Sequence, residues 1–323
     1  MFRQLLLILT ASFILVSCGS LNKAAVRTTS EILYTASFDI ESESNWENFE
    51  KSVLPNLKMA EGMLSLQPEN PDLLATLTKG YAGYALAVNE TLWMDDLYSN
   101  KMESAHQDQA IANYSKAFEF GLRYINLKKI EYRDLSLKMN DEGAIANLLE
   151  KNFDSESLRD KEAILYSAMS LSSLINLQKN KSSLVAQLPI AKQMMDWVCN
   201  KDPKIASGAC GIFYGAYESS RPKLLGGNPQ KGQEHFLKVL KEFPENHLAR
   251  VLYIQHYIVP SLEENLFKEQ MSFLQEQENK FNESWPWTKK KKELTPAEKR
   301  LRLYQAIAFK RFNILKKYVK ELF

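Results

Sequence analysis

The segment Tyr217–Phe236, YESSRPKLLGGNPQKGQEHF, contains a helix end, a rigid loop and a helix start within a short length. Pro222 cannot continue the preceding helix, and the Gly226–Gly227 pair supplies backbone freedom that includes positive φ. Asn228 is a predicted N-cap, and Pro229 suits the first helical position because its missing N–H is not needed there. The segment therefore joins two helical hairpins, either as a packing device that fixes their angle or as a partner-binding or cavity-rim surface.

Three segments share a plan of helix, proline-marked turn and second helix, and this plan predicts the architecture. The turns contain Pro68, Pro203 and Pro244. Apolar residues eight positions before and nine positions after each proline can interlock; the pairs are Ala60 with Leu77, Met195 with Ile212, and Phe236 with Tyr253. Apolar residues recur at helical spacing, and no long alternating β-branched run occurs. We predict an all-α fold of TPR-like helical hairpins stacked into a single helical-repeat domain, with an irregular helical bundle as the alternative.

The predicted helical domain covers residues 46–284. Residues 18–45 are rich in Ser, Thr and Glu and are predicted to form a tether with one short helix. Residues 285–323 begin with a basic loop that contains Lys289–Lys292, which we interpret as a solvated connector rather than a patch for nucleic acid or anionic lipid. Thr295–Glu298 is a capping box that starts a C-terminal helix, whose apolar stripe must pack on the domain or on a neighbouring subunit.

The N-terminus predicts the compartment. Residues 1–17 combine a basic start at Arg3 with a short apolar run, and Leu15–Cys18 (LVSC) closes this run as a lipobox. The run is too short to span a bilayer, so a lipoprotein signal peptide is favoured over a transmembrane anchor. Cys18 would then be the lipidated N-terminus, for example with palmitate. Because Gly19 and Ser20 follow it without an Asp, we predict a lipid anchor in the outer membrane that faces the periplasm.

Composition and motifs argue against catalysis and against nucleic acid. The chain has 323 residues, 45% hydrophobic and 25% charged, with a formal net charge of +2, so no basic surface for nucleic acid is indicated. No GxSxG, HExxH, Walker or Rossmann pattern occurs, and the four histidines are not spaced as metal ligands. His235 beside Glu234 lacks a partner nucleophile and is interpreted as a helix-surface or core-edge residue. We predict no enzyme activity, no cofactor and no metal.

Two features remain open at the level of sequence. Cys199 and Cys210 can form a disulfide in an oxidising compartment, or they can be two buried thiols, because Cys210 is expected about two helical turns beyond the bend. Aromatic residues on the predicted hairpins are mostly core, but stacked hairpins form concave surfaces on which some of them can bind a peptide, a partner or a hydrophobic ligand. The aromatic candidates are Tyr81, Tyr84, Trp93, Tyr214 and Tyr217.

Several stretches together resemble a family of periplasmic lipoproteins, the TatT component of TPR-associated TRAP transporters. Leu54–Leu74 and Lys79–Ala85 resemble the first helical pair of that family, and Leu188–Tyr217 resembles a second block. The most specific likeness is an arginine-proline, double-glycine and histidine-phenylalanine signature. In this chain its residues are Arg221, Pro222, Leu225, Gly226, Gly227, Asn228, Pro229, His235 and Phe236.

The resemblance implies an accessory protein without catalysis that associates with a solute-binding P subunit of a TRAP transporter. It also implies a ligand that is an organic acid or a more hydrophobic small molecule, bound in or passed through a cavity, and a homo-oligomer would suit such a design. The alternative interpretation is a TPR-like lipoprotein scaffold for assembly of the outer membrane or the cell wall.

Overall fold

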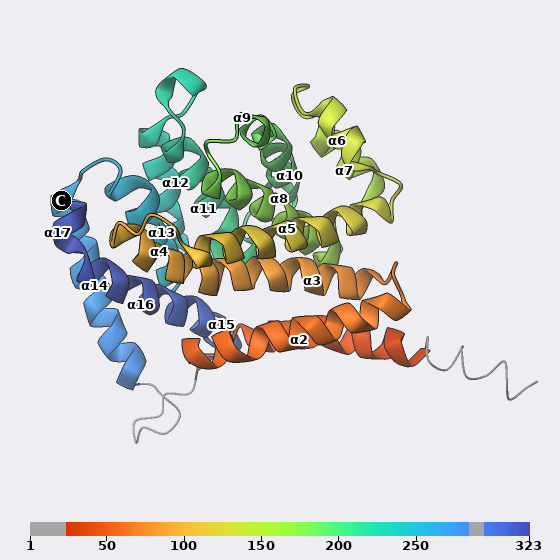
Figure 1. Cartoon of the computed structure of the whole chain (residues 1–323), viewed down its shortest axis with the longest axis horizontal. Coiled ribbons are helices and arrows are strands. Elements are labelled where there is room, and N and C mark those ends of the chain that lie inside the picture. Colours follow the sequence, from red (N-terminus) through yellow and green to blue (C-terminus); the bar gives the residue numbers. More distant parts are fainter. Residues whose placement is uncertain (1–23, 284–293) are drawn as a thin grey trace, which may run out of the picture.

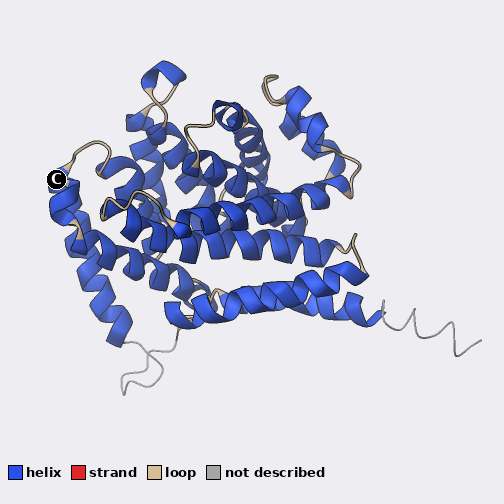
Figure 2. Cartoon of the chain, in the orientation of Figure 1, coloured by secondary structure: helices blue, strands red, loops and turns tan. Residues whose placement is uncertain are grey.

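The computed structural model describes residues 24–283 and 294–323, and this part of the chain consists of helices and their connections without any strand (Figure 2). The lipidation site predicted at Cys18 and the lysine run Lys289–Lys292 lie outside the described residues. The all-α prediction is therefore confirmed for the part that the structure describes. In Figure 1, α2, α3 and α5 lie one above another, and the remaining helices extend from this stack.

Two π-helical turns, η1 and η3, interrupt the succession of α-helices. The order is α2 (Trp46–Leu66), α3 (Pro71–Tyr84), η1 (Ala85–Asn89), α4 (Glu90–Tyr98), α5 (Ala105–Asn126), α6 (Tyr132–Lys138), α7 (Ala144–Asn152), α8 (Leu158–Leu177), α9 (Ser182–Val185), α10 (Leu188–Lys201), α11 (Ile205–Ser220), η2 (Lys223–Leu225), α12 (Pro229–Glu242), α13 (His247–Tyr253), η3 (Ile254–Ile258), α14 (Glu264–Glu283), α15 (Pro296–Arg300), α16 (Arg302–Lys317) and α17 (Val319–Leu322).

The three proline-marked turns fall where the sequence predicts them, between α2 and α3, α10 and α11, and α12 and α13. Two of the three second helices start at an asparagine cap, where Asn70 accepts from the N–H groups of α3 and Asn246 accepts from the N–H of Ala249. The predicted interlocking pair Phe236 and Tyr253 is in ring contact, with centroids 5.3 Å apart. These local signals explain why the chain folds into antiparallel helical pairs.

The segment predicted as a tether is structured over much of its length. Residues 24–40 form a helix that lies beside α2 in Figure 1. Ser30 on this helix is fully buried and accepts from the Asn70 side-chain amide, and the Tyr34 hydroxyl donates to Glu162 of α8. Long-range polar contacts thus attach this helix to Asn70, the cap of α3, and to α8.

The C-terminal helix α16 packs into its own domain rather than projecting from it. Its Arg311 is 1% exposed and lies between the two π-helical turns. The Arg311 guanidinium donates to Thr91 Oγ1 at 2.9 Å, to Gln255 Oε1 at 3.0 Å and to the Leu86 carbonyl oxygen. One buried arginine thus joins helices that are more than two hundred residues apart in the sequence.

The structure resolves the open question about the cysteines, because Cys199 and Cys210 form a disulfide with Cα atoms 5.8 Å apart. Ala206, Ser207 and Gly208 all have positive φ, so the first turn of α11 is not a right-handed helix. This left-handed turn brings Cys210 close to the end of α10. The expected separation of about two helical turns is therefore wrong, since it assumed a regular helix after Pro203.

We predict that Cys199 and Cys210 contribute no free thiol to the folded, oxidised protein. In a Cys18→Ala background, the denatured but unreduced chain should not react with a thiol reagent, and reduction should release the two thiols of the bond. Replacing both cysteines by alanine should lower the free energy of unfolding by ~2–3 kcal/mol, because the short closed loop no longer restricts the unfolded chain. Reaction of two thiols without a reductant would contradict the pairing.

A second prediction concerns His247, which is 4% exposed and lies between the rings of Phe273 and Phe309. Burial, helped by the charge of Arg250, lowers the pKa of His247 from 6.5 to about 4. Between these values the unfolded chain binds a proton that the folded protein does not, so the free energy of unfolding falls as the pH falls. His247→Leu should remove this loss, worth up to about 3 kcal/mol, in urea titrations between pH 7 and pH 4. Parallel pH profiles of variant and wild type would refute it.

Candidate functional site: the central cavity

A cavity of about 850 Å³ lies between the N-terminal helix, α2, α3, α8, α11, α13 and α16, and we call it the central cavity. Its lining is predominantly apolar, as Phe49, Leu57, Met169, Phe213 and Leu252 illustrate. This volume and lining are typical of sites for small organic molecules. Helical pairs alone do not close it, because both the N-terminal helix and α16 contribute parts of the wall.

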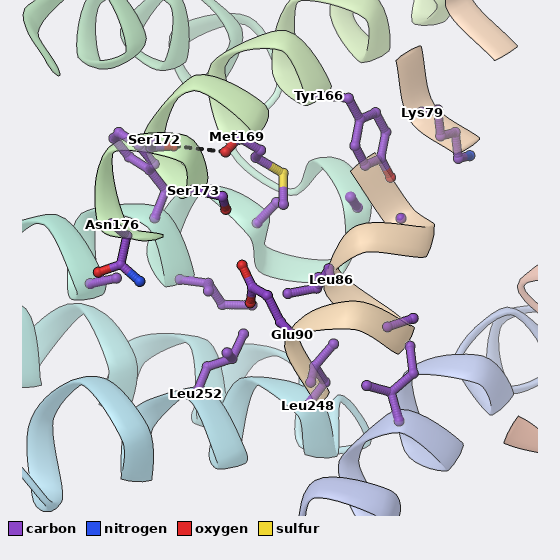
Figure 3. A pocket seen from close by; sticks show the side chains of 18 of the residues that line it. Lys79, Leu86, Glu90, Tyr166, Met169, Ser172, Ser173, Asn176, Leu248 and Leu252 are labelled. Carbon is purple, nitrogen blue, oxygen red and sulfur yellow. Dashed lines mark hydrogen bonds between the residues drawn. The ribbon is translucent and has the colours of Figure 1, made fainter. Parts of the chain in front are cut away.

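Glu90 is a charged residue of the lining and lies at the point where η1 passes into α4. Its carboxylate accepts from the Tyr114 hydroxyl at 2.9 Å and lies 3.5 Å from Arg311 Nη2. Figure 3 shows this carboxylate directed toward Ser173 and Met169 of α8. Burial raises the pKa of Glu90, although the positive charge of Arg311 opposes the shift.

A second polar group lies where the N-terminal helix meets α3 and α8. Lys79 Nζ is 2.9 Å from carboxylate oxygens of both Glu41 and Glu162. Burial by itself would lower the pKa of Lys79, but the two carboxylates outweigh it and raise the pKa. Lys79 is therefore a fully paired cation. Tyr166 and Tyr304 line the cavity beside this cluster, and burial raises the pKa of both hydroxyls well above 10.0.

The remaining titratable residues of the lining differ in charge and accessibility. Burial, together with the charges of Lys179 and Arg311, lowers the pKa of His256 to about 4, so this imidazole is neutral at pH 7. Lys179 lies in the turn after α8, is exposed and borders the cavity. Arg221 also borders the cavity, and its Nη2 is 3.1 Å from Glu218.

Three of the residues singled out from the sequence line the cavity: Tyr217, Arg221 and Pro222. The Arg221 guanidinium covers the Tyr217 ring at 3.7 Å from its centroid and donates through Nε to the Tyr217 carbonyl oxygen. Arg221 therefore satisfies a carbonyl at the end of α11 while it borders the cavity. Arg221 thus has a packing contact at the end of α11 and also lies at the rim of the cavity, the two interpretations offered for Tyr217–Phe236.

The other candidate residues with side chains lie elsewhere. Tyr81 stacks on Phe120 and donates to Glu61, and Tyr84 is 8% exposed in the core. Trp93 is partly buried against the core. Tyr214 donates to Asp196 and its ring lies 5.5 Å from that of His235.

Helical phase explains the position of the two tyrosines of α3. Thr76, Lys79, Gly80 and Gly83 occupy positions i, i+3, i+4 and i+7 and form the face of α3 that lines the cavity. Tyr81 and Tyr84 project from other faces of the same helix. The sequence pattern alone did not show which face would be covered.

The two glycines of the Gly226–Gly227 turn are needed for different physical reasons. Gly226 has φ +78°, the left-handed conformation expected of the pair. Gly227 has no positive φ, but a Cβ there would lie 2.0 Å from the Arg221 carbonyl oxygen. Its N–H donates to the Pro222 carbonyl oxygen at 3.1 Å. Leu225 belongs to η2, and its side chain is not among those that the structure describes.

Glu90, Lys79 and Arg311 were not identified as functional candidates from the sequence. Each is an ordinary charged residue within an amphipathic helical pattern, which usually indicates a solvated helix face. The signal that could have helped is local. Glu90 comes soon after Ala85–Val88 (ALAV), an apolar stretch where a helix at the surface would be expected to carry a polar residue. The partners of all three come from distant segments, so no spacing rule reaches them.

A comparison with protein-family models matches residues 43–279 with a family described as TRAP transporter T-component. The chain belongs to this family. A comparison with curated proteins found no match. As a T-component, the protein is an accessory of a TRAP transporter, and the resemblance that the arginine-proline and double-glycine signature indicated is confirmed. The match ends before α15, so the C-terminal helix that completes the cavity of this T-component lies outside it.

In the part of the T-component that the structure describes, neither a metal-binding group of side chains nor a membrane-spanning helix is found. Over residues 24–283 and 294–323, no group of three or more His, Cys, Asp or Glu side chains is placed to hold a metal ion. Within the same ranges, no helix has both the length and the apolarity needed to cross a bilayer.

We predict that Gly227 is more sensitive to substitution than its backbone conformation suggests. Gly227→Ala should lower the free energy of unfolding by ~1 kcal/mol or more, because its Cβ would overlap the Arg221 carbonyl group. Gly62→Ala in α2 is the matched control, since a Cβ at Gly62 meets nothing within 4 Å and alanine favours helix. Equal effects of the two substitutions in chemical denaturation would contradict this explanation.

Proposed function

We propose that this T-component binds a small, mainly apolar molecule in the central cavity and works with a solute-binding P subunit of a TRAP transporter. The observation that carries the proposal is the cavity of about 850 Å³, whose lining is apolar apart from a few fixed polar groups. A cavity of this size in a folded core costs packing energy, so we infer that binding compensates for it. Membership of the TRAP transporter T-component family supports the transport role.

We further propose that the mature protein is a lipoprotein with its lipid on Cys18, held at the outer membrane and facing the periplasm. The lipobox Leu15–Cys18 supports this, and the Cys199–Cys210 disulfide agrees with an oxidising compartment. Palmitate should label the wild-type protein and should not label Cys18→Ala. Equal labelling of the two would argue against the anchor.

The P subunit is proposed to contact the loop that follows α11, close to the cavity. Leu224 in this loop is 99% exposed, and its neighbours Arg221 and Pro222 border the cavity. An exposed apolar side chain beside the cavity could be buried by the P subunit when the two proteins associate to exchange a ligand.

Leu224→Glu should therefore reduce co-purification of the P subunit from membranes severalfold without changing the melting temperature. Leu137→Glu is the matched control, because Leu137 is 71% exposed on α6 and does not line the cavity. If the wild-type protein retains no P subunit while it retains barrel-assembly or cell-wall factors, the scaffold function replaces this proposal. If Leu137→Glu has the same effect as Leu224→Glu, the contact is not at this loop.

A further inference from the structure

The pair of Glu90 and Arg311 is a charged element inside an otherwise apolar cavity, and the two residues differ in how they face the cavity. The side chain of Glu90 keeps 15% of its surface exposed, whereas that of Arg311 keeps 2%. Because Glu90 lines the cavity and Arg311 does not, the carboxylate is presented to the cavity and the guanidinium lies behind it. Figure 3 shows the same orientation of Glu90.

The Arg311 guanidinium is engaged mainly with neutral acceptors. Thr91, Gln255 and the Leu86 carbonyl accept three of its hydrogen bonds, while Glu90 Oε2 is further away at 3.5 Å. Four of its five N–H donors thus have acceptors within the protein, and its charge balances that of Glu90. A carboxylate has about four acceptor positions. On Glu90, Tyr114 at 2.9 Å, Arg311 Nη2 at 3.5 Å and Ser173 take up three of them, which leaves one for a ligand.

Among the described residues that line the cavity, the other basic side chains are paired, neutral or at its edge. Arg221 borders the cavity and lies 3.1 Å from Glu218. Lys79 is paired with Glu41 and Glu162, and His256 is neutral at pH 7 because burial lowers its pKa to about 4. Lys179 lies at the exposed edge. The interior thus offers an acceptor within a charge-balanced pair, and an ionic head group of either sign would lose its hydration there without full compensation.

We propose that the central cavity selects an uncharged, largely apolar molecule whose hydroxyl group donates a hydrogen bond to Glu90, and that it discriminates against the corresponding carboxylate. This inference rests on the proposed function and narrows its ligand class from organic acids or hydrophobic molecules to neutral alcohols. Arg311 acts as a positioning residue: it lies between the two π-helical turns, a kind of helical irregularity that is frequent at functional sites, and holds Glu90 at the cavity wall.

The test compares ligands that differ only in the head group: decan-1-ol, decanoate and decylammonium. Their equilibrium binding to the purified protein is measured at pH 8, where the acid and the amine are both charged. The wild-type protein should bind decan-1-ol at least about tenfold more tightly than either ion, because only the alcohol avoids an uncompensated loss of hydration.

Glu90→Gln should weaken or abolish this preference for the alcohol over the acid. The amide keeps an oxygen for the Tyr114 hydroxyl, but it leaves the buried charge of Arg311 without a partner, so decanoate should gain at least about tenfold in affinity relative to decan-1-ol. Glu61→Gln is the matched control, since Glu61 accepts from Lys116 and Tyr81 but does not line the cavity. It should leave the ratio of the two affinities unchanged.

The outcomes separate this inference from the proposed function. Tighter binding of decanoate to the wild-type protein, lost in Lys179→Ala, would place an acidic head group at the exposed edge and overturn the inference while keeping a ligand-binding cavity. Tighter binding of decylammonium would also overturn it. No binding of any of the three would refute the ligand-binding function itself. Because Lys179 is exposed and the wild-type comparison needs no variant, the test stands even if Glu90→Gln fails to fold.

Discussion

The buried guanidinium of Arg311 is the interaction on which the arrangement around the cavity depends. It reaches from α16 to the carbonyl of Leu86 in η1 and to the side chain of Gln255 in η3. A π-helical turn shifts the backbone hydrogen bonds by one residue and leaves local strain, which an external donor can offset. Removing one member of a buried charged network commonly costs about 3–5 kcal/mol, so such a network persists where its geometry is needed. Here that geometry holds Glu90 at the cavity wall.

The helical architecture was predictable because its causes are local in the sequence. Proline-marked turns, asparagine caps and apolar stripes act within a few residues, and the structure follows them at Pro68, Pro203 and Pro244. The predictions fail where the backbone departs from regular geometry. The left-handed turn over Ala206–Gly208 brings Cys210 within bonding distance of Cys199, which a regular helix was not expected to do. Of the residue types in this turn, only the glycine favours a left-handed conformation.

The site was far less predictable than the fold, for a physical reason. A cavity is defined by residues that do not touch, and its wall comes from segments as distant as Ser37 on the N-terminal helix and Ile307 on α16. The aromatic residues Tyr81 and Tyr84 looked like ligand contacts by type, yet the packing of α3 turns them into the core. By contrast, Tyr217, Arg221 and Pro222 reach the cavity because a helix end and a proline turn place them at an opening between hairpins.

The family match ends before the C-terminal segment that completes the cavity wall. Residues 43–279 supply most of the cavity wall, but Arg311, whose charge opposes the rise in the pKa of Glu90, lies beyond the match, as do Tyr304 and Ile307. A segment outside the matched range can change the polarity of the site, because α16 packs on α13, α14, α4 and α2 and brings Arg311, Tyr304 and Ile307 to it. Under the proposed ligand-binding function, the helical hairpins would enclose the ligand and α16 would determine which head group the cavity accepts.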